Sequence, residues 1–283
     1  MAKLTSLTLE YVKVDEEDFK KINESFPFLE VLIMNRVIGL REPTIHLPHL
    51  KICRFTGYPR VMAISAPKLT QLKLRCIEPS RLALECPMVS DLRISIIKPT
   101  GTIGIETPQN LRHLKIKSLD VPQLLRHFKG TKHLRTLKLE VSPIMSWFDS
   151  YSIFTINDIH DNFGKVEELT FGPVAWYLWQ RSLPSVSMRK PMCLRRLVVY
   201  LPPDNFGILG LMTNVLKMYT PLHVVHLHFF SDAAETKKDT IAKLQNAFPG
   251  VTWTWDADVA TLDGDVENLI VGFSVAGAPE SAS

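Results

Sequence analysis

The sequence has few cysteines and no long apolar run, and each scarcity argues against a class of protein. Its four cysteines stand singly and never as C-x-x-C, so the sequence predicts neither a zinc knuckle nor a redox pair; they are Cys53, Cys76, Cys86 and Cys193. We expect all four to be structural. No run approaches the roughly eighteen apolar residues of a membrane span, and the start at Met1 has no apolar signal segment. We therefore expect no membrane association and a place in the cytoplasm, the nucleus or both.

Short catalytic and ligand-binding motifs are also missing. The sequence has no G-x-S-x-G, no H-E-x-x-H, no Walker loop and no complete G-x-G-x-x-G, since Gly101-Thr-Ile-Gly104 lacks the third glycine. The cluster Asp263-Gly-Asp265 does not continue into a calcium-binding loop. We expect no enzymatic activity, no cofactor and no metal site in this chain.

A strand motif of the form L-x-x-L-x-L recurs along most of the chain. Five copies follow one another closely: Leu50–Phe55, Leu69–Leu74, Val89–Ile94, Leu111–Ile116 and Leu134–Leu139. The same frame, which makes about ten repeats in all, extends to the anchors Leu4, Leu29, Val166, Leu194 and Leu222. The motif predicts an α/β fold, a leucine-rich repeat solenoid whose curved parallel sheet carries helices or irregular turns on its convex face.

The spacing of the repeats predicts how the outer elements change along the chain. Anchor residues are 19–25 residues apart up to Leu134 and 28–32 residues apart after it, so the later repeats have room for longer helices. Apolar stripes and end signals predict helices over residues 15–26, 120–128, 205–219 and 233–248. We expect one leucine-rich repeat domain over residues 1–270, followed by a disordered tail over residues 271–283.

Side chains at the x positions point away from the core onto the concave sheet, because side chains alternate along a strand. In the compact repeats these positions are mainly cationic, against only Asp91 and Glu140; the candidates for partner binding are Arg54, Lys73, Arg75, Arg93, His113, Lys115, Lys117 and Lys138. Such a surface would attract an acidic or phosphorylated protein segment or a polyphosphate. The alternative is that the cations only solvate an exposed sheet and discourage association through its edge. Nucleic acid fits less well, since no aromatic residues interleave with the cations.

Two aromatic-rich segments, residues 142–164 and residues 173–191, interrupt the regular spacing of the repeats. The aromatic residues that we consider as a possible interface are Trp147, Phe148, Tyr151, Trp176 and Trp179. Exposed aromatic side chains beside basic residues are typical of protein interfaces, so these segments are candidates for a second partner-binding patch. The alternative is that they cover the sheet edge or fill the space between unequal repeats.

His226 and His228 occupy one face of the strand that follows Leu222, and they would point onto the same concave sheet as the cations. Two histidines on one face are half of a conceivable metal site. The repeat geometry places no carboxylate or cysteine beside them, so we expect two exposed surface histidines and no bound metal.

Three of the short repeats share a proline just before the anchor: Phe26-Pro-Phe-Leu29-Glu-Val-Leu32, Ala66-Pro-Lys-Leu69-Thr-Gln-Leu-Lys-Leu74 and Cys86-Pro-Met-Val89-Ser-Asp-Leu92. They resemble the repeat region of plant F-box/LRR proteins, and the likeness covers nearly all of residues 1–260. In that family the repeats select a protein for ubiquitination, while an N-terminal F-box docks on the adaptor of an SCF-type ligase. The resemblance therefore implies a role in substrate recognition.

The chain departs from that family because it starts inside a repeat, at Leu4, with no F-box before it. We expect either the C-terminal part of a longer protein or a shortened member that binds without recruiting a ligase. Two functions stay open. One is substrate recognition in an SCF-type ubiquitin ligase, whose adaptor would be reached only through the missing F-box; the other is a scaffold or decoy without a ubiquitin role. A weaker third interpretation is a sensor that holds an acidic small ligand against the basic sheet.

Overall fold

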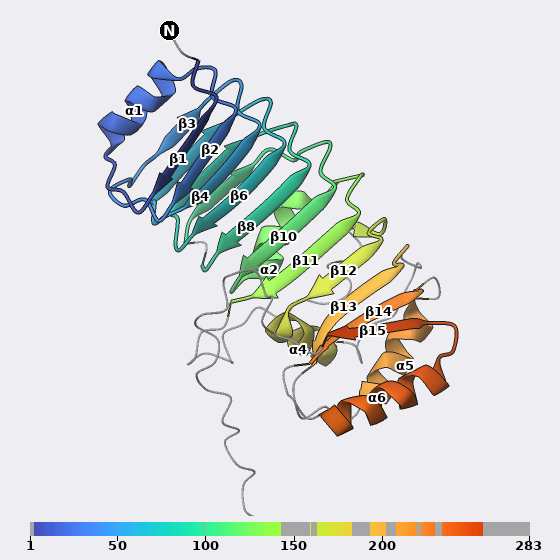
Figure 1. Ribbon diagram of the computed structural model, residues 1–283. Helices are drawn as coiled ribbons and strands as arrows, with labels where there is room; N and C mark the ends of the chain where they lie inside the picture. Colours follow the sequence, from blue (N-terminus) through green and yellow to red (C-terminus); the bar gives the residue numbers. More distant parts are fainter. Residues whose placement is uncertain are drawn as a thin grey trace, which may run out of the picture.

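The computed structural model describes residues 3–98, 100–142, 159, 163–182, 193–201, 208–219, 222–229 and 234–256. Successive repeats lie side by side along the length of the molecule, from the blue N-terminal end to red β15 (Figure 1). This is the architecture of a leucine-rich repeat solenoid, so the predicted fold class is confirmed. Eleven parallel strands form the large sheet, in the order β1 (Ser6–Glu10), β2 (Val31–Asn35), β4 (Ile52–Thr56), β6 (Gln71–Cys76), β8 (Asp91–Ile96), β10 (His113–Ser118), β11 (Thr136–Val141), β12 (Glu168–Phe171), β13 (Arg196–Leu201), β14 (Val224–Phe229) and β15 (Thr252–Asp256).

The apolar positions of L-x-x-L-x-L form the hydrophobic core. In every repeat from the one anchored at Leu29 to the one anchored at Leu222, all three of these side chains are buried. Register pairs equivalent positions, so that Leu114 lies between Leu92 and Leu137 on the neighbouring strands. The first repeat differs: Leu4 is 37% exposed, because β1 is the edge strand and has a neighbour on one side only. The frame read from the sequence is therefore confirmed.

A second parallel sheet covers the other side of the core in the compact repeats. Its four strands lie behind the large sheet in Figure 1 and are β3 (Thr44–His46), β5 (Val61–Ser65), β7 (Arg81–Glu85) and β9 (Thr102–Ile105). Alternate side chains such as Met62, Ile64, Leu82 and Leu84 point inward and are buried. The repeat motif predicted helices or irregular turns on this side of the core. The compact repeats anchored at Leu29, Leu50, Leu69 and Val89 instead close the core with a short strand, since alternation of apolar residues buries one face of a strand.

The helix α1 (Glu16–Ser25) lies at the N-terminal end of the stack, beside β3 (Figure 1). It begins where the Asp15 carboxylate accepts a hydrogen bond from the backbone N–H of Asp18, at 2.8 Å. The side chain of Asn23 forms hydrogen bonds with the backbone of β3, the edge strand of the small sheet. Its amide donates to the carbonyl of Thr44, and its carbonyl accepts from the N–H of His46. The helix thus satisfies backbone groups that an edge strand would otherwise leave unpaired.

Helices are the outer elements of the repeat anchored at Leu111, which is still a compact one, and of later repeats, whose longer spacing predicts them. They are α2 (Val121–Leu125), the 3-10 helix η1 (Arg126–Phe128), α4 (Pro173–Ser182), α5 (Ile208–Met218) and α6 (Ala234–Ala247). The expected helices over 120–128, 205–219 and 233–248 are therefore confirmed to within a few residues, as is the first, over 15–26.

The helix α4 corrects the interpretation of the second aromatic segment. It starts directly after β12 with Pro173 in its first turn, where a missing N–H costs nothing, and packs against β11, β12 and β13. Trp176 and Trp179 are 1% and 0% exposed. Their indoles stack with centroids 5.1 Å apart, and Trp179 also stacks on Phe171 at 5.0 Å. Both tryptophans belong to the core, so their assignment to a partner-binding patch is wrong.

Some expectations fall on residues outside those that the structure describes. Trp147, Phe148 and Tyr151 are among them, and so are residues 257–283, which include the expected tail. The limits of the repeat domain therefore stay a prediction. Within the described part of the chain, no helix combines the length and the apolar character needed to span a membrane.

Candidate binding surfaces on the outer face

The outer face of the large sheet, which is turned away from the core, carries the cations predicted from the sequence. Register places five of them on successive strands as one row, which we call the basic row: Arg54, Lys73, Arg93, Lys115 and Lys138. Neighbouring strands are about 4.8 Å apart. This spacing is shorter than the Debye length of about 8 Å at physiological ionic strength, so the potentials of neighbouring charges add.

The remaining predicted cations flank the basic row on the same face. Arg75 and Lys117 lie two residues after Lys73 and Lys115, and both pair with Ser95 of β8. His113 lies two residues before Lys115 and pairs with Asp91. All eight side chains therefore share one surface, as the alternation of the repeat predicts. Their role in binding a partner stays a prediction.

Two carboxylates partly neutralise the last three members of the basic row. Oε1 of Glu140 lies 3.2 Å from Nζ of both Lys115 and Lys138, and the Glu140 side chain is only 17% exposed. Asp91 pairs with Arg93, with 3.3 Å between Oδ1 and Nε. Among the residues that the structure describes, no carboxylate lies within ion-pair distance of Arg54 or Lys73. Within the basic row, the uncompensated positive charge therefore lies on β4 and β6.

The basic row ends at β11. The next positions in register are Thr170 on β12 and Val198 on β13, and both are buried. Tyr200, two residues beyond Val198, is buried as well. Thr170 and Val198 therefore stand between the basic row and the polar group on β14 and β15.

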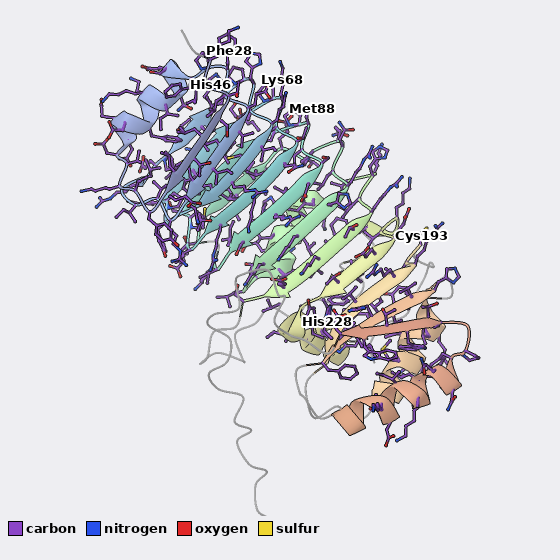
Figure 2. All side chains as sticks on the ribbon, viewed as in Figure 1. Phe28, His46, Lys68, Met88, Cys193 and His228 are labelled. Atoms are coloured by element: carbon purple, nitrogen blue, oxygen red, sulfur yellow. The ribbon has the colours of Figure 1, made fainter. Side chains whose placement is uncertain are left out.

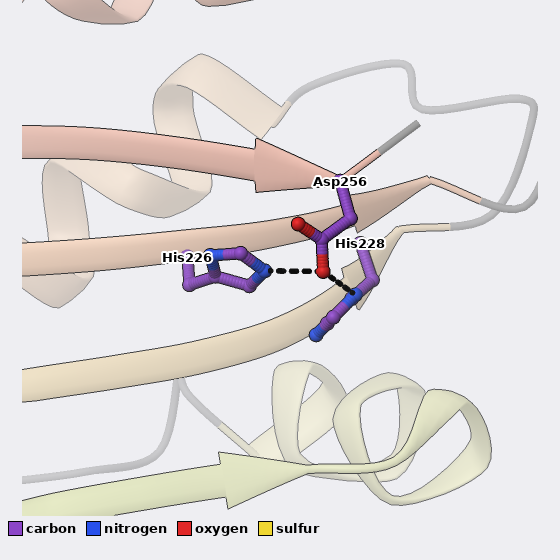
Figure 3. Close-up of side chains that lie close together, drawn as sticks. All are labelled: His226, His228 and Asp256. Carbon is purple, nitrogen blue, oxygen red and sulfur yellow. Dashed lines mark hydrogen bonds and ion pairs between the residues drawn. The ribbon is translucent and has the colours of Figure 1, made fainter. Parts of the chain in front are cut away.

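That polar group combines two histidines with one aspartate, and we call it the His–Asp cluster: His226, His228 and Asp256. His228 and Asp256 are direct partners in the pairing of β14 with β15. Oδ2 of Asp256 lies 3.1 Å from Nε2 of His226 and 3.4 Å from Nδ1 of His228 (Figure 3). The expectation that no carboxylate stands beside the histidines is wrong, because β15 continues the repeat frame and places Asp256 there.

The histidines of the cluster are also less exposed than expected. Their side chains are 13% and 23% exposed for His226 and His228. Burial and the neighbouring His226 lower the pKa of His228 to about 4, while the charge of Asp256 acts in the opposite direction. His228 is therefore neutral at neutral pH. Its ring stacks on Tyr200 with centroids 4.4 Å apart, in the C-terminal half of the molecule (Figure 2).

A further feature that the sequence analysis missed runs along the edge where the chain turns into the large sheet. Figure 2 shows Phe28, Lys68 and Met88, each the residue just before an anchor, pointing outward along this edge. The ring of Phe28 stacks on His49 at 5.5 Å, and Nζ of Lys68 lies 3.2 Å from Nδ1 of His49. Phe28 and Met88 are 46% and 47% exposed. Each of these residues stands one position before an anchor in the sequence, and this position would have predicted an exposed side chain at the edge of the sheet.

Comparison with known proteins adds one relative. No protein-family model matches the chain, and no solved structure matches it. The chain is similar to an F-box/LRR-repeat protein of Arabidopsis thaliana: the two are 33% identical over 179 residues, which is 62% of this chain and 40% of the relative. The chain thus spans about two fifths of the length of the curated relative that it matches. The resemblance read from the short repeats is confirmed.

Proposed function

We propose that this chain, a relative of the plant F-box/LRR-repeat proteins, is a protein-binding repeat region that selects the substrate of an SCF-type ubiquitin ligase. The observation that supports binding is the basic row on an open parallel sheet. A role in a ubiquitin ligase is supported by the similarity to a relative that is named as an F-box/LRR-repeat protein. On this proposal, the protein acts in the cytoplasm or the nucleus.

The chemistry of the basic row favours an acidic partner. Arg54 and Lys73 are exposed, adjacent and without a carboxylate partner among the described residues, so a negatively charged segment can replace only water there. Arginine can grip a carboxylate or a phosphate through two parallel hydrogen bonds. A partner segment that is acidic or phosphorylated and extends across β4 to β8 would therefore bring its charges to the strongest part of the potential.

Charge reversal tests the binding surface. The variant Arg54→Glu/Lys73→Glu should lose the proteins that copurify with the wild-type chain from plant cells at physiological salt, as measured by quantitative mass spectrometry. A matched control, Arg81→Glu/Lys129→Glu, reverses one arginine and one lysine that are exposed away from the outer face and should retain them. Equal recovery by both variants contradicts a role for the basic row.

A second arm of the same experiment tests the ligase. The native gene product should bring down an SCF adaptor and a cullin together with the proteins captured through the basic row. Copurifying partners without any adaptor or cullin would favour the alternative, a scaffold or decoy with no role in ubiquitination. The two arms are independent, because charge reversal on β4 and β6 leaves recruitment of the adaptor through an F-box unchanged.

A further inference from the structure

We propose that the His–Asp cluster is a binding site for a divalent transition-metal ion, with zinc as the ion of choice. The site is distinct from the basic row, and it goes beyond the proposed role in substrate recognition. It is formed by one face of the last two strands that the structure describes. Within the described residues, these three side chains form the one group that brings at least three metal-ligating atoms together, all within 4.8 Å of one another.

The donor set fits zinc. Imidazole nitrogen and carboxylate oxygen are ligands that zinc binds at about 2.0–2.2 Å, and tetrahedral geometry then places neighbouring ligand atoms about 3.3 Å apart. The distances from Oδ2 of Asp256, 3.1 Å to His226 and 3.4 Å to His228, already lie close to that value. The third pair of ligand atoms, on His226 and His228, lies within 4.8 Å, so binding requires the two histidine side chains to turn toward a common point beside Asp256.

The surroundings hold the ligands in a suitable orientation. Oγ1 of Thr254 lies 2.7 Å from Nδ1 of His226, so the hydroxyl can accept a hydrogen bond from Nδ1–H, which leaves the lone pair on Nε2 to coordinate the metal. Metal-binding histidines usually have such a partner on the second ring nitrogen. Tyr200 fixes the plane of His228 by stacking on it. Thr254 is thus a positioning residue of the site.

The site keeps one side open. Asp256 is 49% exposed, whereas the two histidines are largely buried, so solvent reaches the cluster from the aspartate side. Three protein ligands with an accessible fourth position are the pattern of zinc sites that bind water or an external ligand. The fourth ligand could be a carboxylate, a histidine or a cysteine thiolate of a protein bound to the outer face. The metal would then form a second contact point beyond the basic row.

Zinc titration of the untagged chain in a Cys193→Ser background tests the proposal, because an exposed thiol could bind zinc independently. Isothermal calorimetry should show one saturable zinc per chain. This binding should be lost in His226→Asn/His228→Asn and retained in the control His113→Asn, which removes an exposed histidine of the same face. Thr254→Val should weaken zinc affinity by about 10- to 100-fold while leaving all three ligands in place.

Two results overturn the proposal: no saturable zinc binding by the Cys193→Ser chain, or equal affinity in the double variant and the control. Far-UV circular dichroism checks that each variant folds. If the double variant does not fold, Asp256→Asn takes its place, since that side chain is half exposed and the substitution preserves its shape. Zinc bound by Asp256→Asn as tightly as by the control would then contradict the site. Loss of partner binding in the charge-reversal variant leaves these measurements unchanged, so the two proposals fail separately.

Discussion

The ammonium nitrogen of Lys115 lies 3.2 Å from Oε1 of Glu140 on the adjacent strand, and both side chains are mostly buried. Lys73, two strands away in the same row, is exposed and has no such carboxylate among the described residues. The sequence pattern makes the two lysines equivalent. The structure gives Lys115 a part in the stability of the sheet and leaves Lys73 available to a partner.

Replacing Lys115 by alanine should destabilise the protein, whereas Lys73→Ala should not. Without Lys115, the partly buried Glu140 keeps only the ion pair with Lys138 among the described residues. We expect a loss of about 1 kcal/mol in the free energy of unfolding, measured by urea denaturation at low salt. The loss should shrink at about 1 M sodium chloride, where the Debye length falls to about 3 Å. Equal stability of the two variants would show that the Glu140 network contributes nothing.

The repeat frame predicts a much larger cost in the core. Leu114 is 2% exposed and lies between Leu92 and Leu137 in register, so Leu114→Ala should reduce the free energy of unfolding by about 2–5 kcal/mol. The adjacent His113→Ala, at an exposed position, serves as the control and should change stability by no more than about 0.5 kcal/mol. If the two costs were reversed, the strand would have to present its other face to the core.

The sequence was informative where one physical signal dominates. Burial of Leu29, Leu72 and Leu227 follows directly from the repeat, because a parallel stack of equivalent strands keeps equivalent side chains on one face. The small sheet was missed although the alternation at Met62 and Ile64 was visible. A short segment within a repeat of about twenty residues can close the core as a strand or as an irregular turn, and the periodicity alone does not separate the two.

The candidate sites were predicted in part for a related reason. The basic row follows from alternation, but its ion pairs depend on how side chains of neighbouring strands meet, as Lys138 and Glu140 do. The His–Asp cluster was missed because the frame was not extended to Asp256, the partner of His228 in register. Aromatic composition misled the interpretation of Trp176 and Trp179, since both interfaces and cores are rich in aromatic residues. Pro173, Trp176 and Trp179 are each three residues apart, and this spacing is the sequence signal for a helix with both indoles on one face.

Trp176 should act in stability and not as a binding hot spot. Its indole is buried and packs on Trp179 and Phe171 beneath β11 to β13, so Trp176→Ala should cost about 3–5 kcal/mol of unfolding free energy. Near-UV circular dichroism should lose the contribution of the stacked indoles. The milder Trp176→Phe keeps a ring in the same place, and it should recover part of the stability and retain partner binding. Loss of binding in Trp176→Phe at unchanged stability would restore the interface interpretation.

Thiol reactivity gives a test of the core that needs no substitution. Burial raises the pKa of the Cys53, Cys76 and Cys86 thiols to about 12, because a thiolate is disfavoured in apolar surroundings. The thiolate is the reactive form, so these three cysteines should resist iodoacetamide at about pH 8, whereas the exposed Cys193 should be alkylated. Mass spectrometry should find one modification on the native chain and four after denaturation in urea. Rapid alkylation of Cys53 in the native protein would mean that the compact repeats open locally, since its sulfur lies at a buried leucine position of the repeat.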